Sequence, residues 1–173
     1  MQLHNALEML KHPQVDGARQ TWAELGCGSG TFTLALAAIL QQDSMIHAMD
    51  SDNAGLSKIP DNYQGVNIQK WQGDFVKDGL PFNDVDGVLM ANSLHYVKDK
   101  KLFLKKAAAH IKAPGYFMIV EYNTTTSNAW VPYPVCFTAL KQLFENAGYH
   151  QVEKLKEYPS VYGETMYSAL VRR

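Results

Sequence analysis

The sequence has little cysteine, no excess of either charge and no long apolar run. Only two of its 173 residues are cysteines, Cys27 and Cys136, and no CxxC pair or Cys/His cluster occurs. This spacing predicts neither a disulfide framework nor a metal site. Sixteen basic against 17 acidic residues leave a formal net charge of -1, whereas nucleic-acid-binding domains usually carry a clear excess of Lys and Arg. Nucleic acid is therefore not the expected partner.

The sequence also lacks targeting signals and linkers. No apolar run approaches the length of a membrane span, and residues 1–11 form an amphipathic segment rather than a charged leader followed by an apolar stretch. We therefore expect a cytoplasmic protein that does not enter a membrane. There is no internal repeat and no linker rich in Pro, Gly and Ser. The length and the 46% hydrophobic content predict a single domain over 1–173, with a short helical lid at 1–20 and a core at 21–173.

Apolar runs alternate with helical patterns along the chain. Strands are predicted at 21–25, 45–49, 66–72, 85–91, 116–122, 150–157 and 165–171. The first predicted helix carries Leu3, Leu7 and Leu10 on one face and is ended by Pro13 with Asp16-Gly17. Further helices are predicted at 31–40, 53–59, 99–111 and from 137 to the residue before Gly148. Pro114-Gly115 should close the fourth helix, and the turn-rich Pro159–Gly163 should join the last two strands as an antiparallel pair. The alternation predicts an α/β fold with a doubly wound, mostly parallel seven-stranded sheet and an antiparallel C-terminal strand.

A glycine cluster, Gly26-Cys27-Gly28-Ser29-Gly30, stands between the first predicted strand and the following helix. Such a turn lets the backbone approach a ligand closely, and the helix N-terminus presents free N–H groups, although glycine turns often serve only to bend the chain. Counted from Gly26, the third glycine of the dinucleotide fingerprint G-x-G-x-x-G would fall on Thr31, so that fingerprint is missing. An NAD-dependent oxidoreductase is therefore disfavoured.

The run Glu24-Leu25-Gly26-Cys27-Gly28-Ser29-Gly30 resembles the E-x-G-x-G-x-G motif of class I S-adenosylmethionine-dependent methyltransferases. Asp50 ends the second strand about twenty residues further on, where a carboxylate can accept both ribose hydroxyls. The resemblance implies a Rossmann-like fold and S-adenosylmethionine as cofactor. It also implies that Asp74 binds the adenine amino group and that Phe75 covers the ring. The full set of cofactor-binding residues that it implies is Glu24, Gly26, Cys27, Gly28, Gly30, Asp50, Ser51, Asp74, Phe75 and Asn92.

The segment after the fourth strand, Asn92-Ser93-Leu94-His95, indicates the class of methyl acceptor. Amino-directed DNA methyltransferases carry an Asn/Asp-Pro-Pro-aromatic run there, and cytosine C5 enzymes carry a Pro-Cys nucleophile. This chain has neither motif. Asn92-Ser93-Leu94-His95 contains no proline, and Cys136 is separated from Pro134 by Val135. The segment is similar to that of small-molecule members of the family. We therefore expect transfer to an O, N or C atom of a small molecule, with an RNA or protein acceptor less favoured.

Methyl transfer from a sulfonium depends mainly on placement and exclusion of water, so no nucleophilic residue is required. His95 and Tyr96 lie beyond the carboxyl end of a central strand, where ligands bind in open α/β sheets. His95 is the candidate catalytic base, although histidine in such a place is more often a structural hydrogen-bonding group or a pocket wall. Trp130 and Tyr133 are candidates for an aromatic wall over a flat acceptor, with packing against the core as the alternative.

Two questions stay open at the level of sequence. The same glycine turn is compatible with a non-catalytic S-adenosylmethionine-binding domain that regulates a partner. The predicted lid is also short for the family. Either residues 1–20 and the loop at 123–135 form the whole lid, or a second copy of the chain or another partner completes it.

Overall fold

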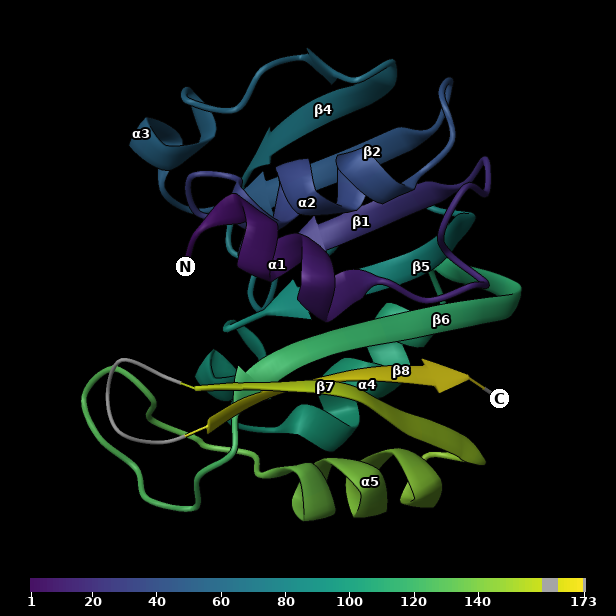
Figure 1. Ribbon diagram of the computed structural model, residues 1–173. Helices are drawn as coiled ribbons and strands as arrows, with labels where there is room; N and C mark the ends of the chain where they lie inside the picture. Colours follow the sequence, from purple (N-terminus) through teal and green to yellow (C-terminus); the bar gives the residue numbers. More distant parts are fainter. Residues whose placement is uncertain (160–164, 173) are drawn as a thin grey trace.

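One mixed sheet organises the computed structural model, which describes residues 1–159 and 165–172 (Figure 1). The strands of this described part are β1 (Thr21–Leu25), β2 (Met45–Asp50), β3 (Asn62–Tyr63), β4 (Val66–Gln72), β5 (Val85–Ala91), β6 (Ile111–Tyr122), β7 (Gln151–Pro159) and β8 (Thr165–Arg172). The helices are α1 (Leu3–Leu10), α2 (Thr31–Ile39), α3 (Asn53–Leu56), α4 (Lys100–Ala108), α5 (Phe137–Asn146) and the 3-10 turn η1 (Leu94–Tyr96). The spatial order of the strands is β3-β4-β2-β1-β5-β6-β8-β7.

The predicted fold class is confirmed, with one strand more than expected. The five strands β4, β2, β1, β5 and β6 run parallel, and β8 pairs antiparallel with both β6 and β7. The eighth strand, β3, has only two residues and pairs antiparallel with β4. A two-residue strand is too short for any periodicity to reveal it. From residue 160 on, the predicted turn at Pro159–Gly163 lies outside the described residues.

The boundary between α4 and β6 differs from the expectation. Pro114-Gly115 was expected to close the helix, but α4 ends at Ala108 and β6 begins at Ile111. Residues 112–115 form an irregularity within β6, because Val85 of β5 pairs with Ile111 while Gly87 pairs with Tyr116. Proline cannot donate to a ladder and is tolerated at such bulges. The sequence pattern therefore predicted an interruption of regular structure at Pro114-Gly115, but this interruption lies within β6 and not at the end of α4.

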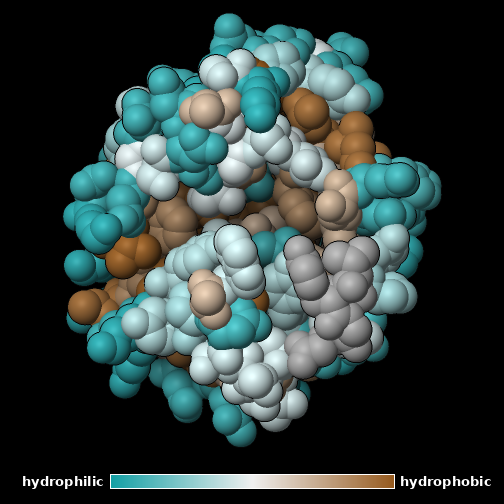
Figure 2. Space-filling model, turned by 90° about the vertical axis from the view of Figure 1, so that its left-hand side faces the viewer, coloured by the Kyte–Doolittle hydropathy of each residue, from teal (hydrophilic) through white to brown (hydrophobic). Residues whose placement is uncertain are grey.

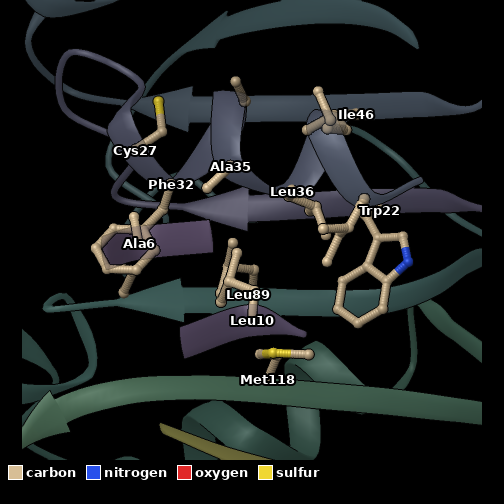
Figure 3. Packing of buried hydrophobic residues seen from close by; sticks show 14 of the residues in the cluster. Ala6, Leu10, Trp22, Cys27, Phe32, Ala35, Leu36, Ile46, Leu89 and Met118 are labelled. Carbon is tan, nitrogen blue, oxygen red and sulfur yellow. The ribbon is translucent and has the colours of Figure 1, made fainter. Parts of the chain in front are cut away.

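The two faces of the sheet are buried under different helices. Residues of α1 and α2 pack with Trp22, Leu89 and Met118 in one cluster, whose close packing Figure 3 shows. Residues of α4 and α5 form a second cluster on the other face with Phe117 and Tyr167. The segment 73–84 between β4 and β5 contains no helix. Its residues are therefore free to line the edge of the sheet.

Asp86 and Gly87 of β5 have low strand propensity, but contacts with neighbouring residues explain both. A Cβ on Gly87 would lie 2.5 Å from the indole ring of Trp22, so only glycine leaves room for that ring. The Asp86 carboxylate accepts a hydrogen bond from the backbone N–H of Thr21, and Lys112 donates to its other oxygen. Packing and pairing between strands thus outweigh the local propensity.

The connections of the sheet reverse direction between β1 and β5. From β1 the chain moves outward to β2 and β4, and it then returns to β5 and β6 on the opposite side. In open α/β sheets, ligands bind outside the carboxyl ends of the strands at such a switch point. The glycine turn follows β1 and Asn92 follows β5, so the switch point carries both segments that the sequence singled out.

Candidate functional site

A cavity of about 620 Å³ opens at the carboxyl ends of the parallel strands. This volume falls in the range of roughly 300–1,000 Å³ that is typical of small-molecule sites. Figure 2 views the molecule from this side and shows a central hollow with apolar residues at its bottom. The lining residues are Gly26, Gly28, Asp50, Ser51, Asp52, Gly73, Asp74, Phe75, Val76, Lys77, Asn92, Ser93 and Tyr96.

The glycine turn uses left-handed backbone conformations at three positions. Gly26, Gly28 and Gly30 have φ values of +78°, +53° and +87°. A Cβ on Gly26 would lie 2.6 Å from the Cβ of Ser93, and one on Gly30 would lie 2.7 Å from a side-chain carbon of Ile59. A Cβ on Gly28 would meet no atom within 4 Å. Gly26 and Gly30 therefore serve close packing, whereas the backbone of Gly28 faces open space in the cavity.

Glu24 and Cys27 lie beneath the turn and do not line the cavity. Glu24 is buried and accepts a hydrogen bond from the hydroxyl of Thr33 on α2. The pKa of Glu24 is raised to about 8, mainly by burial and also by the charge of Asp50, while the Thr33 bond opposes the shift. The Cys27 side chain belongs to the core cluster on the α1 and α2 face, and burial raises the pKa of its thiol. We assign both residues to shaping the turn.

Asp50 connects the end of β2 to the glycine turn. Its Oδ2 accepts the backbone N–H of Gly28 at 2.7 Å, and its Oδ1 accepts the backbone N–H of Asp52 at 2.8 Å. Each carboxylate oxygen can accept more than one hydrogen bond, so both retain capacity for a ligand hydroxyl. Asp52 also caps α3 through the N–H of Ala54. The carboxylate is thus held in a defined orientation at the cavity wall.

Asp74 forms the opposite acidic wall at the end of β4. Its Oδ1 accepts the backbone N–H of Val76 at 2.9 Å, and its Oδ2 lies 2.8 Å from Nζ of Lys77. The Lys77 hydrogen bond lowers the pKa of Asp74, burial opposes this shift, and the backbone bonds reinforce it. The ring of Phe75 packs edge-on against Phe103 with centroids 5.7 Å apart. An apolar ring therefore stands beside an ionised carboxylate.

The third wall follows β5. Asn92 adopts a left-handed conformation with φ +56°, and its side-chain oxygen is buried with no hydrogen-bond partner among the described residues. Ser93 donates its hydroxyl to the carbonyl of Leu25 and so joins the ends of β1 and β5. Tyr96 is 53% exposed at the cavity rim. An unpaired buried acceptor is costly, and the Asn92 oxygen is therefore a candidate contact for a polar ligand group.

His95 is buried behind this wall rather than exposed in the cavity. Its ring nitrogen Nδ1 lies 2.8 Å from Oε2 of Glu121, and its backbone N–H donates to Oε1 at 3.0 Å. The His95 ring also packs against that of Tyr96, with centroids 4.3 Å apart. Only 2% of His95 is exposed. The geometry therefore favours His95 as support for Tyr96.

The predicted aromatic wall is only loosely connected to the cavity. Trp130 is 81% exposed, and neither it nor Tyr133 is among the lining residues. Tyr133 is nevertheless tied to the site, because its N–H donates to the carbonyl of His95 and its carbonyl accepts from Nζ of Lys100. The loop that carries both aromatic residues is thus anchored beside η1.

Sequence reasoning missed several residues of the site. The cavity residues that it did not assign to the site are Asp52, Gly73, Val76, Lys77 and Ser93. Each lies within three residues of a residue that was named, so extending the search along each strand-end loop would have found them. Glu121 had no such signal. It stands at the end of an apolar strand, and only the pairing of β5 with β6 brings it next to His95.

Within residues 1–159 and 165–172, no helix combines the length and apolar content needed to cross a bilayer. The same residues contain no group of three or more His, Cys, Asp or Glu side chains placed to hold a metal ion.

Comparison with known proteins identifies what the chain is similar to. Residues 23–115, just over half of the chain, match the family model described as a methyltransferase domain. No curated protein matches the sequence. The fold matches that of the YcgJ protein from Bacillus subtilis with a TM-score of 0.75 and 12% identity, covering 98% of both chains.

Two further solved structures have the same fold. A SAM-dependent methyltransferase from Aquifex aeolicus matches with a TM-score of 0.67 and 19% identity, over 90% of this chain and 84% of that one. The DhpI–SAH complex matches with a TM-score of 0.71 and 18% identity, over 95% and 81%.

Proposed function

The chain belongs to the methyltransferase domain family, and we propose that it transfers the methyl group of S-adenosylmethionine to an O, N or C atom of a small-molecule acceptor. The observation that carries this proposal is the convergence of the glycine turn, Asp50 and Asp74 around one cavity at the switch point of the sheet. Two solved structures with this fold are described as a SAM-dependent methyltransferase and as a complex with SAH.

The cavity residues suit the chemistry of an adenosyl ligand. Asp50 presents oriented carboxylate oxygens for ribose hydroxyls, and Asp74 presents an acceptor for the adenine amino group beside the apolar ring of Phe75. The open space at Gly28 lets a ligand approach the backbone. The unpaired oxygen of Asn92 offers one further acceptor. The residues present therefore fit the group.

The chain's own contribution is placement and exclusion of water. When bound, S-adenosylmethionine supplies an electrophilic methyl group, so the residues around it need only orient the acceptor in line. Tyr96 stands at the cavity rim, where it can orient such an acceptor. His95 supports Tyr96 from behind. In this proposal Trp130 and Tyr133 form an outer wall that closes over the acceptor.

The proposal is tested by methyl transfer itself. The purified chain is incubated with S-adenosylmethionine labelled in the methyl group and with fractionated small-molecule extracts, and labelled products are identified by mass spectrometry. A variant with Asp50→Ala serves as the negative control. Transfer of label to a low-molecular-weight product supports the proposal. Tight binding of the cofactor without transfer to any fraction would instead favour a non-catalytic binding domain.

A further inference from the structure

Glu121 is a buried carboxylate that contributes no atom to the cavity wall. Its side chain is 1% exposed, and it follows four buried apolar residues, 117–120, on β6. Removing a carboxylate from water is costly, and apolar side chains often stabilise such a position equally well. From its contacts we infer that Glu121 is a positioning residue for the methyl-transfer site, which holds η1 in place and keeps a proton on Nδ1 of His95. This inference rests on the proposed function.

Glu121 holds the backbone of η1. A short 3-10 turn leaves its first N–H groups without internal partners. Oε1 of Glu121 accepts the N–H of His95, and Tyr133 donates its N–H to the carbonyl of the same residue. The turn is thus fixed from two sides. Because Ser93 and Tyr96 flank this fixed point and line the cavity, Glu121 sets the position of the wall that follows β5.

Glu121 also contacts the imidazole of His95. Oε2 of Glu121 lies 2.8 Å from Nδ1 and also accepts the N–H of Tyr122 at 3.3 Å. An ionised carboxylate can only accept hydrogen bonds, so its contact with Nδ1 places a proton on that nitrogen. A partner on one ring nitrogen determines the tautomer and the orientation of the ring. Glu121 thereby also orients the ring against which Tyr96 packs.

The tautomer is measured without any ligand. Long-range proton–nitrogen correlation spectra of the labelled full chain report which ring nitrogen of His95 is protonated. We expect a protonated Nδ1 in the unaltered protein, and in Glu121→Gln we expect a form with the proton on Nε2, together with shifted amide signals for residues 93–96. The matched control is Ser168→Ala on the neighbouring strand β8, because the Ser168 hydroxyl is buried with no partner among the described residues. An unprotonated Nδ1 in the unaltered protein, or unshifted 93–96 signals in Glu121→Gln, would overturn the inference.

Affinity for S-adenosylhomocysteine, measured by calorimetry, tests whether Glu121 acts on the methyl-transfer site. We expect the dissociation constant to rise about tenfold in Glu121→Ala and less in Glu121→Gln, because the amide oxygen of Gln can still accept the N–H of His95. Ser168→Ala should leave it unchanged. A purely structural role would lower the melting temperature of both Glu121 variants but leave affinity unaltered, and this would overturn the inference. If Glu121→Ala does not fold, Glu121→Gln decides. Failure of the unaltered chain to bind S-adenosylhomocysteine would refute the proposed function. The spectra would still decide whether Glu121 holds η1 and keeps the proton on Nδ1 of His95.

Discussion

The backbone N–H of Gly28 donates a 2.7 Å hydrogen bond to Oδ2 of Asp50, which joins the turn after β1 to the end of β2. The two residues are 22 positions apart. The strand before the turn, β1, and the strand that ends at Asp50, β2, are adjacent and parallel. Both line the cavity, so a single hydrogen bond orients the acidic group and the glycine backbone together. A ligand that contacts either residue therefore depends on the position of both.

The first prediction concerns which ligand stabilises the fold. S-adenosylhomocysteine at a hundredfold excess over its dissociation constant should stabilise the protein by about 2.7 kcal/mol, and NAD should not. The reason is that the acidic and glycine residues surround a cavity suited to one adenosyl group. A thermal-shift series measures this preference. The reverse order of the two ligands would refute the assignment of the site.

The second prediction concerns Asp50. Replacement by Ala should weaken S-adenosylhomocysteine binding by about 1.5–3 kcal/mol, the usual value for hydrogen bonds to a charged group. Asp50→Asn should weaken it less, because the amide oxygen can still accept the N–H of Gly28 or of Asp52. Calorimetry on both variants and on the unaltered chain provides the comparison. Equal affinity in all three proteins would mean that the ligand binds elsewhere.

The third prediction compares glycines. Gly28→Ala should keep the fold but reduce ligand affinity, since a Cβ there meets no protein atom and points into open space. Gly26→Ala should destabilise the fold itself, because its Cβ would clash with Ser93. Gly17→Ala is the matched control: it has φ +69°, no atom within 4 Å of a Cβ and no place in the cavity. If Gly17→Ala and Gly28→Ala had the same affinity, Gly28 would have no part in binding.

The fourth prediction concerns His95. His95→Ala should leave cofactor affinity nearly intact, because its backbone N–H still reaches Glu121. Turnover should fall only modestly, whereas loss of a general base should cost about 10²–10⁴ in rate. A base would also impose an acidic limb on the pH profile of turnover, because a protonated ring cannot accept a proton. A large rate loss together with disappearance of that limb in His95→Ala would identify His95 as the base.

The fifth prediction is a pH dependence of stability. Burial raises the pKa of Glu24 from 4.5 to about 8, so between these pH values the folded protein holds a proton that the unfolded chain releases. The contribution of Glu24 to stability is therefore present below pH 4.5 and is lost as pH rises toward 8, by up to about 1.4 kcal/mol per pH unit. Glu24→Gln should not show this loss. Denaturation of both proteins across this range measures the difference, and parallel curves would contradict the prediction.

Much of the fold follows from the sequence, because alternating apolar runs and helical patterns are local signals. All seven predicted strands are present, and the sheet is mostly parallel with the expected antiparallel end. Two of the differences have clear physical reasons. β3 is too short to show a period, and the irregularity at residues 112–115 depends on how β6 pairs with β5. The pairing of two strands depends on residues of both strands, so a pattern along one of them does not reveal it.

The candidate site likewise contains residues that the sequence revealed and residues that it did not. Gly26, Gly28, Asp50 and Asp74 were recognisable because residues at the carboxyl ends of parallel strands must meet at one edge of the sheet. The burial of His95 and its pairing with Glu121 were not recognisable, since the two residues are 26 positions apart and meet only because β5 and β6 are neighbours. The amino-acid sequence by itself determined the family, and short, local motifs indicated which residues meet at the switch point of the sheet. Only the tertiary structure decided which polar groups became buried, because burial depends on what the rest of the chain packs over them.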